Sequence, residues 1–505
     1  MLRLTWVQPE DLVGHELRQA AQDGRCAASV ERRWLAAGGC AAPERVGASP
    51  VPVSPELRVL AGVLLDELAE IPPAAGEPTE LGGIAALCPA YEGVRLGSRE
   101  NGFVGGCGSV VAGRAHAAVA AHSIQSRAPY GATLGRELKG PSAAVPESSA
   151  VIPRLHAAWL GRAVGCLLGK PVEKVSLAGI RAIAGSTANW PLNGYFTEVG
   201  LDPAVAAAHP WNRRSRPTSL VENIDGMPED DDLNYPLLGL LLLQRYGHGF
   251  STADVASLWL DELPAGRTFT AERVAYRNLL CGVEPPATAT YRNPFREWIG
   301  AQIRADVYGW TNPGAPARAA ELAHRDATLT HTANGVYGAV FVAAVVAHAA
   351  GPEPTTVHEA LATGLRFVPP DSRYARAIRF GIDTARAEPT GTAAGFATVV
   401  DALHARYGRD HHWVHVLPNA ALLAAALTHA DGDFTGSICR AVSGGWDTDS
   451  NGASAGSIAG LLAGSPDAID ERWTAPLKNR LATTVAGFDG IGFDELARLT
   501  AESTA

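Results

Sequence analysis

The sequence predicts an all-α protein, and three features of the chain indicate this fold class. Apolar residues recur at helical spacing over most of the chain, as Ile299, Ile303 and Val307 do. Between residues 155 and 495 no segment sustains the period-two alternation of apolar and polar residues that a half-buried strand requires. Alanine and glycine are abundant, which suits closely packed helices. We therefore expect a compact multihelical fold with few strands.

The bulk properties of the chain exclude several classes of function. A net charge of −10 argues against a nucleic-acid partner, which would require a basic face. The seven cysteines are scattered and form no CxxC pair, which fits a reducing compartment better than a disulfide framework or a zinc site. The first residues contain no apolar block typical of a signal peptide, and the longest apolar stretch, 335–347, is shorter than the roughly 20 residues that span a bilayer. We expect a cytoplasmic protein without membrane contact.

The sequence predicts four consecutive parts. Residues 1–70 read as a helical N-terminal extension, in which Pro9-Glu10-Asp11 is a typical helix start. Residues 71–150 are rich in glycine with few periodic apolar positions, so we expect a poorly ordered linker or insertion. Residues 151–495 form the main helical domain, and residues 496–505 form a tail.

A glycine-faced helix opens the main domain. Gly161, Gly165 and Gly169 recur every four residues, so they share one helical face, where a neighbouring helix can approach closely. Pro171 ends this helix and leaves Glu173 on the loop that follows. Helix packing alone accounts for the glycines, whereas Glu173 is a candidate functional acid.

The first acidic loop is Glu229-Asp230-Asp231-Asp232, which precedes the apolar helix 237–243. One or two acids at a helix start are ordinary, because they complement the helix dipole. Four consecutive carboxylates beside an apolar helix repel one another unless a cation or several donors compensate. The pattern therefore favours metal binding over helix capping.

The second acidic loop contains Asp447, Asp449 and Ser450 between glycines and precedes the small-residue run 453–464. On a helix the two aspartates would point about 200° apart, so they can face one ligand only from a loop. Hard oxygen ligands on a turn indicate Mg²⁺ or a similar cation, and an Asp/Ser turn that caps a helix is the alternative. If the two acidic loops meet, their oxygens suffice for two Mg²⁺ ions.

Three further motifs carry weaker signals. The arginines at 213, 214 and 216 could hold a phosphate, but solvated surface arginines explain them as well. His411 and His415 are four residues apart without the intervening Glu of a zinc HExxH motif. Ser454 lies in a G-x-S-x-G pattern, yet no apolar strand precedes it as a serine-hydrolase elbow requires. We favour helix packing for Ser454.

From about Leu155 to Phe488 the chain resembles the ADP-ribosylglycohydrolases, and three motifs in the family's order carry the resemblance. The helix 161–169 with Glu173 is similar to the family's glycine-rich opening helix and its following Glu. Glu229–Asp232 stands where members have Thr-Asp-Asp-Thr. Gly445–Asn451 is similar to the family's Gly-Asp-Thr-Asp-Thr segment.

The resemblance implies an all-α ADP-ribosylglycohydrolase-like domain with two Mg²⁺ ions, or Mn²⁺ in their place, that cleaves ADP-ribose from a modified protein or small molecule. Glu173 would be the acid at the glycosidic bond, and Asn334-Gly335 would correspond to a substrate-contacting Asn-Gly loop. Glycoside cleavage needs such an acid and an activated water. A non-catalytic protein that binds ADP-ribose or a nucleotide through the same pocket is the alternative. The implied metal ligands are Glu229, Asp230, Asp231, Asp447, Asp449 and Ser450.

The chain departs from the family's pattern at four of these motif positions. Glu229 and Asp232 replace the two threonines of Thr-Asp-Asp-Thr, and Ser450 replaces a threonine. Cys166 stands where many members have an aspartate. The two added carboxylates increase the negative charge of the implied site, which bears on the preferred ion and on the substrate.

Overall fold

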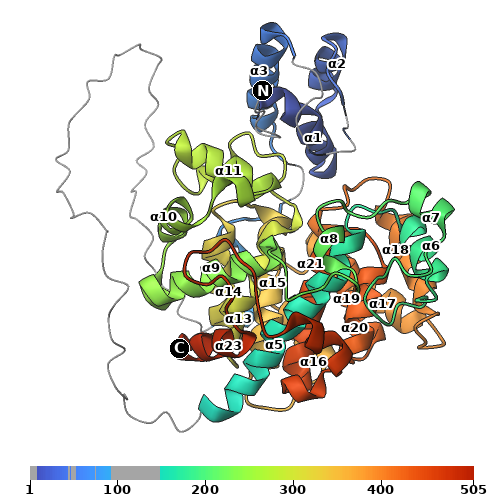
Figure 1. Ribbon diagram of the computed structural model, residues 1–505. Coiled ribbons are helices and arrows are strands. Elements are labelled where there is room, and N and C mark those ends of the chain that lie inside the picture. The colour runs from blue at the N-terminus through green and yellow to red at the C-terminus, as the bar shows by residue number, and fades with distance from the viewer. Residues whose placement is uncertain (1–7, 42, 44–45, 47–52, 74–75, 93–147) are drawn as a thin grey trace. The chain divides into compact units, whose positions relative to one another are not determined.

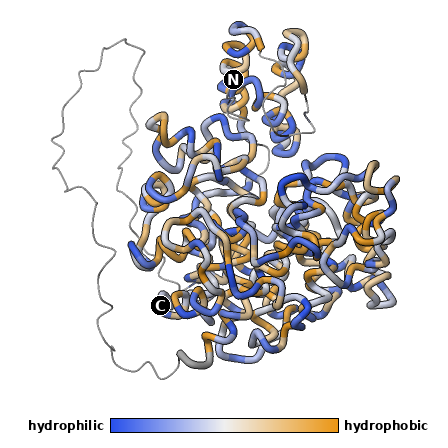
Figure 2. Tube along the Cα trace, in the orientation of Figure 1, coloured by the Kyte–Doolittle hydropathy of each residue, from blue (hydrophilic) through white to orange (hydrophobic). Residues whose placement is uncertain are grey.

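The computed structural model describes residues 8–92, apart from 42, 44–45, 47–52 and 74–75, and residues 148–505. Over these residues the chain is built from α-helices and short 3₁₀ turns, and strand-like pairing is limited to three isolated bridges. Hydrophobic and hydrophilic residues alternate along the helices (Figure 2), as in amphipathic helices with one buried face. The predicted all-α fold is confirmed.

Helices α1 (Pro9–Gln22), α2 (Ala28–Ala36) and α3 (Pro55–Ala69) form the N-terminal group (Figure 1). Their buried residues, such as Leu12, Trp34 and Leu64, belong to one apolar cluster that also contains Phe295 and Trp298. The extension therefore shares a core with the main helical part, and the described residues within 8–92 and 148–505 together form one compact unit.

Helices α5 (Ser148–Gly169) and α21 (Thr448–Ala463) pack along each other through their glycines. A Cβ atom on Gly165 would lie 1.9 Å from the carbonyl oxygen of Gly452, so only glycine allows the two backbones to approach this closely. The Thr448 hydroxyl donates to the carbonyl of Gly169 at 2.9 Å. The C-terminal end of α5 therefore lies beside the start of α21.

Helix α15 (Ala333–Ala350) is, among the described residues, the one helix long and apolar enough to cross a membrane. Its most apolar window is 89% buried inside the fold, as in a core helix. The remaining α-helices of the main part are α6 (Leu177–Ser186), α7 (Pro203–Ala208), α8 (Arg216–Ser219), α9 (Asp231–Tyr246), α10 (Thr252–Glu262), α11 (Thr270–Leu280), α12 (Ala287–Thr290), α13 (Asp306–Trp310), α14 (Pro316–Ala327), α16 (Val357–Leu365), α17 (Arg373–Ala387), α18 (Phe396–Tyr407), α19 (Val416–His429), α20 (Phe434–Ser443), α22 (Glu471–Thr474) and α23 (Phe493–Glu502).

The structure differs from the predicted boundaries at two places. Most of the predicted linker, residues 93–147, lies outside the described residues, but its described start contains helix α4 (Leu81–Leu87). Helix α23 runs through most of the residues predicted as a tail, and it buries Leu496 and Ala497 against α5. Both segments are helical because tertiary packing supplies a partner that their short sequences do not reveal.

Candidate functional site

The two predicted acidic loops meet in the structure, but only partly as loops: Asp231 and Asp232 lie in the first turn of α9, and Asp449 and Ser450 in the first turn of α21. Asp230 caps helix α9 and Asp447 precedes helix α21. The Ser450 hydroxyl donates to Asp232 at 3.2 Å, which joins segments 218 residues apart. The packing of α5 on α21 positions this contact, because it fixes where α21 begins.

The first acidic group consists of Glu173, Asp447 and Asp449, whose carboxylate oxygens lie within 4.8 Å of one another. Asp447 and Asp449 are buried, and Glu173 is more accessible. Glu173 accepts a hydrogen bond from the Asn212 amide at 2.6 Å and pairs with Lys174 at 2.8 Å. Asp447, just before α21, and Asp449, in its first turn, thus face one acid from the loop after α5.

The electrostatics of this group favour a bound cation. Burial, together with repulsion from Glu173 and Asp230, raises the pKa of Asp449 to about 7. Burial and the neighbouring Asp449 raise the pKa of Asp447 well above its ordinary value. Like-charged buried carboxylates are stabilised as anions only by a cation or by hydrogen-bond donors. The donor set therefore fits a hard divalent ion such as Mg²⁺.

The second acidic group, Cys166, Asp230 and Asp232, contains a cation of its own. The Lys170 ammonium is buried, forms an ion pair with Asp230 and donates to the Glu229 carbonyl at 3.3 Å. Burial is the largest effect and disfavours a charged lysine, but the charge and hydrogen bond of Asp230, together with Cys166 and Asp449, outweigh it and raise the pKa of Lys170. The reciprocal attraction of Lys170 holds the pKa of Asp230 below its ordinary value despite its burial.

Arg162 supplies a second positive charge to this group. Its guanidinium is fully buried, donates to the Asp232 carbonyl at 2.7 Å and pairs with the Asp232 carboxylate at 3.3 Å and with Asp306 at 2.9 Å. Lys170 therefore compensates Asp230, whereas Asp232 shares Arg162 with Asp306, and burial and repulsion from Asp230 keep the pKa of Asp232 well above its ordinary value. The described residues form no ion pair with Asp447 or Asp449, although Lys170 attracts Asp449.

Glu229 lies in neither acidic group. Its Oε1 accepts from the Asn234 amide at 2.9 Å, and its Oε2 pairs with Arg267 at 3.0 Å. Asp231 is half-buried, and its pKa is raised by burial and by Asp230 and Asp232. Asn234 and Arg267 hold both of the Glu229 oxygens, and its role as a metal ligand stays a prediction.

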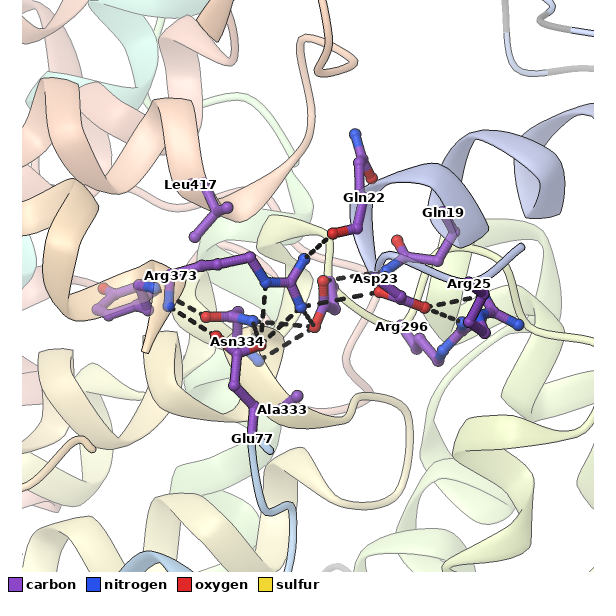
Figure 3. Close-up of polar contacts among 12 residues, drawn as sticks. Gln19, Gln22, Asp23, Arg25, Glu77, Arg296, Ala333, Asn334, Arg373 and Leu417 are labelled. Atoms are coloured by element: carbon purple, nitrogen blue, oxygen red, sulfur yellow. Dashed lines mark hydrogen bonds and ion pairs between the residues drawn. The ribbon is translucent and has the colours of Figure 1, made fainter. Parts of the chain in front are cut away.

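Asn334 and Gly335 also lie outside the acidic groups. The buried Asn334 amide donates to Glu77 at 2.7 Å and to Glu297 at 3.0 Å, and its oxygen accepts from the Tyr374 backbone (Figure 3). A Cβ on Gly335 would meet the Arg296 carbonyl at 2.4 Å. Both residues make structural contacts, and their role in substrate binding stays a prediction.

The sequence reasoning missed Lys170, Asn419 and the stacked pair His404–Trp446. Lys170 follows Cys166 by four residues, a spacing that places both on one helix face and that could have revealed it. The Asn419 oxygen accepts from the Asp447 backbone at 3.2 Å and thereby fixes the loop. The rings of His404 and Trp446 stack at 4.1 Å beside that loop, and no sequence signal connects them.

The weaker motifs have structural explanations. Arg216 forms an exposed ion pair with Glu198. The His411 and His415 rings meet edge to face, and burial lowers the pKa of both histidines, so they are neutral. Ser454 is fully buried within α21, so no substrate can reach it as a nucleophile.

The fold and site define a class of all-α proteins in which helix starts bring together acidic groups that could hold a metal ion. Residues 147–504 match the ADP-ribosylglycohydrolase family, and the chain belongs to this family. A search of curated proteins finds no match. Among solved structures, an ADP-ribosylglycohydrolase-related protein complex is similar, with 18% identity, a TM-score of 0.43, and coverage of 70% of this chain and 98% of that chain.

Proposed function

We propose that this protein is a metal-dependent hydrolase that releases ADP-ribose from a modified protein or small molecule. Membership of the ADP-ribosylglycohydrolase family indicates a hydrolase that acts on ADP-ribosylated substrates. The observation that carries the proposal is the group Glu173, Asp447 and Asp449, in which buried carboxylates face one another without a protein cation between the two aspartates.

Asp447 and Asp449 would hold the cation, with Ser450 and Asp231 close by. A divalent ion there supplies Lewis acidity toward ribose hydroxyls and a water molecule. Glu173 would act as the general acid that protonates the leaving group at the scissile glycosidic bond. Its two hydrogen-bonding partners, Asn212 and Lys174, orient the carboxylate, and its partial exposure keeps it accessible to a substrate.

The number of ions follows from the charge balance. Lys170 already pairs with Asp230, and Arg162 pairs with both Asp232 and Asp306. A second divalent ion would have to displace the Lys170 ammonium from Asp230. We therefore propose one tightly held ion, Mg²⁺ or Mn²⁺, at Asp447 and Asp449, in place of the two that the family resemblance implies.

A non-catalytic ADP-ribose-binding protein is the second candidate, and the Lys170–Asp230 pair favours it. A lysine in place of one metal ion of a two-metal site keeps a positive charge that can attract the ligand. The site then lacks one of the two Lewis acids that would take part in catalysis. Tight ADP-ribose binding in calorimetry, with no release from any substrate, would identify this function.

The experiment is a release assay on ADP-ribosylated arginine and serine peptides, with Mg²⁺, with Mn²⁺ and with chelator. We expect metal-dependent release of ADP-ribose, and a loss of at least about 100-fold in Glu173→Gln, in line with the contribution of general acid–base catalysis. Asp467→Asn, an exposed acid outside the site, is the matched control. Absence of release from both peptides under every metal condition would reject the hydrolase on these substrates.

A further inference from the structure

A cavity of about 480 Å³ lies between α1, α17, α18 and the start of α19. Four arginines line it, Arg18, Arg373, Arg376 and Arg406, and Asp410 is the one acid in the lining. None of its lining residues belongs to the acidic groups around Asp230 and Asp449. The family membership and the proposed hydrolysis leave this cavity unexplained.

Arg373 lines the cavity, and its positive charge is paired with the carboxylates of Glu77 and Glu297. Its guanidinium donates to Glu77 and Glu297 at 2.6 and 2.8 Å, and its Nη1 donates to the Gln22 carbonyl at 3.1 Å (Figure 3). These contacts hold α1 against α17. Arg373 therefore shapes the cavity but brings little uncompensated charge to it.

The other three arginines have no carboxylate partner among the residues that the structure describes. Arg18 donates one nitrogen to the Pro43 carbonyl at 3.0 Å, while its Nη1 is buried without a hydrogen-bond partner. Arg376 donates to the Asp371 carbonyl. Arg406 donates to the Tyr407 hydroxyl at 3.3 Å and lies 4.5 Å over the Phe380 ring. Each guanidinium is fixed through neutral groups and keeps its charge.

Three such charges around one cavity exceed what Asp410 compensates, so the cavity attracts anions. Among the described residues the buried Nη1 of Arg18 has no hydrogen-bond partner, which is costly, and an acceptor in the cavity would satisfy it. Guanidinium groups bind phosphate oxygens through paired hydrogen bonds, and the volume lies in the range of small-molecule sites. An uncharged apolar ligand would leave the three charges unmatched.

We propose that this cavity binds a small molecule carrying two or more phosphate charges, with Arg18, Arg376 and Arg406 as its ligands. The site is distinct from the hydrolytic centre and does not depend on the proposed hydrolase activity. It lies where the N-terminal helix α1 meets α17, so an occupant would add contacts between the extension and the main part of the fold.

Titration calorimetry of the full chain with inorganic pyrophosphate tests the proposal. The experiment uses chelator, so that no metal ion bridges the probe to Asp447 or Asp449, and is repeated in the Asp449→Asn variant. We expect saturable binding to one site in both proteins, and at least tenfold weaker binding in the double variant Arg376→Gln/Arg406→Gln. Both substituted side chains are exposed, so the fold should persist.

The matched control is Arg379→Gln/Arg409→Gln, which removes two exposed arginines of neighbouring positions that do not line the cavity. If this control variant binds pyrophosphate as tightly as the unmodified chain does, the result supports the proposal. Equal weakening by both double variants, or no saturable binding, would overturn it. A parallel titration with ADP separates the ligand sources, because tighter binding than pyrophosphate identifies a nucleotide and equal binding identifies the phosphates alone.

Discussion

Lys170 and Asp230 form a buried ion pair at the point where α5 ends and α9 begins. The lysine is 6% exposed, and its ammonium also donates to the Glu229 carbonyl. This cation sits in the second of the two acidic groups, beside Cys166. The pair is the main reason to expect one divalent ion in this protein.

Replacement of Lys170 by Met should open the second position to a metal ion. The substitution keeps an apolar stem in the helix but leaves Asp230 and Asp232 short of one positive charge, which a divalent ion can supply. We expect about one Mn²⁺ per unmodified chain and about two per Lys170→Met chain, counted by spin resonance of free Mn²⁺. Lys478→Met, at an exposed lysine, should stay at one. Two ions bound to the unmodified chain would contradict the role assigned to Lys170.

Asp449 should link stability to pH in the metal-free protein. Its pKa in the fold, about 7, is above its ordinary 3.8, so the folded state holds the proton more tightly than the unfolded chain. The contribution of Asp449 to stability is therefore largest at low pH and is lost as the pH rises from about 4 to about 7, by at most roughly 1.4 kcal/mol per pH unit.

Buried histidines act in the opposite direction. Burial lowers the pKa of His15 to about 3 and of His411 to about 4, so their contribution to stability is lost as the pH falls below about 6.5. The Asp449 effect must therefore be measured as the difference between the unmodified chain and Asp449→Asn. The free energy of unfolding is measured with urea, in the presence of chelator, at pH 5, 6 and 7. As the pH rises, the unmodified chain should lose stability relative to Asp449→Asn. A difference that does not change with pH would refute the raised pKa.

Much of the site could be predicted because its parts are short motifs. The glycine spacing at 161, 165 and 169 predicted a close helix contact, and α21 provides it. The spacing of Asp447 and Asp449 predicted that both face one ligand from a loop; their oxygens do lie close together, but Asp449 is in the first turn of α21. Glu229 could not be placed from sequence, since its direction depends on Arg267, a residue from another segment.

The described start of the predicted linker shows what local patterns cannot reveal. Glu77 accepts hydrogen bonds from Arg373 and Asn334, and Tyr337 donates to the Pro78 carbonyl. These partners lie about 260 to 300 residues further along the chain. No periodicity or motif links such distant positions, so the sequence predicted a linker where the structure has a segment packed against α15 and α17.

Glu77→Gln should therefore destabilise the fold. The change removes the charge that faces Arg373, whose remaining carboxylate contacts are Glu297 at 2.8 Å and Asp23 at 3.7 Å. Loss of one member of a buried ion pair costs about 3 kcal/mol, and urea unfolding measures it. Glu80→Gln, an exposed neighbour, should change stability by less than about 0.5 kcal/mol. Similar values for the two variants would show that Glu77 does not hold the segment in place.

Gly165→Ala should be more damaging than its one added methyl suggests. The new Cβ would lie 1.9 Å from the backbone carbonyl oxygen of Gly452. The Cβ is fixed to the backbone of α5 and the oxygen to that of α21, so neither atom can move without its helix. The helices α5 and α21 must separate, which costs about 3 kcal/mol or more and displaces Asp447 and Asp449 from Glu173.

The matched control for Gly165 is Gly185→Ala in α6, where the added Cβ meets nothing within 4 Å. Alanine is the better helix former, so Gly185→Ala should stabilise the protein by about 0.5 to 1 kcal/mol. Thermal unfolding separates the two variants, and Mn²⁺ titration of each folded variant reports on the site. Because the same helix contact that sets stability also positions α21, Gly165→Ala should weaken Mn²⁺ binding while Gly185→Ala leaves it unchanged. If Gly165→Ala has reduced thermal stability but normal Mn²⁺ affinity, the glycine contact supports the core without positioning the acids.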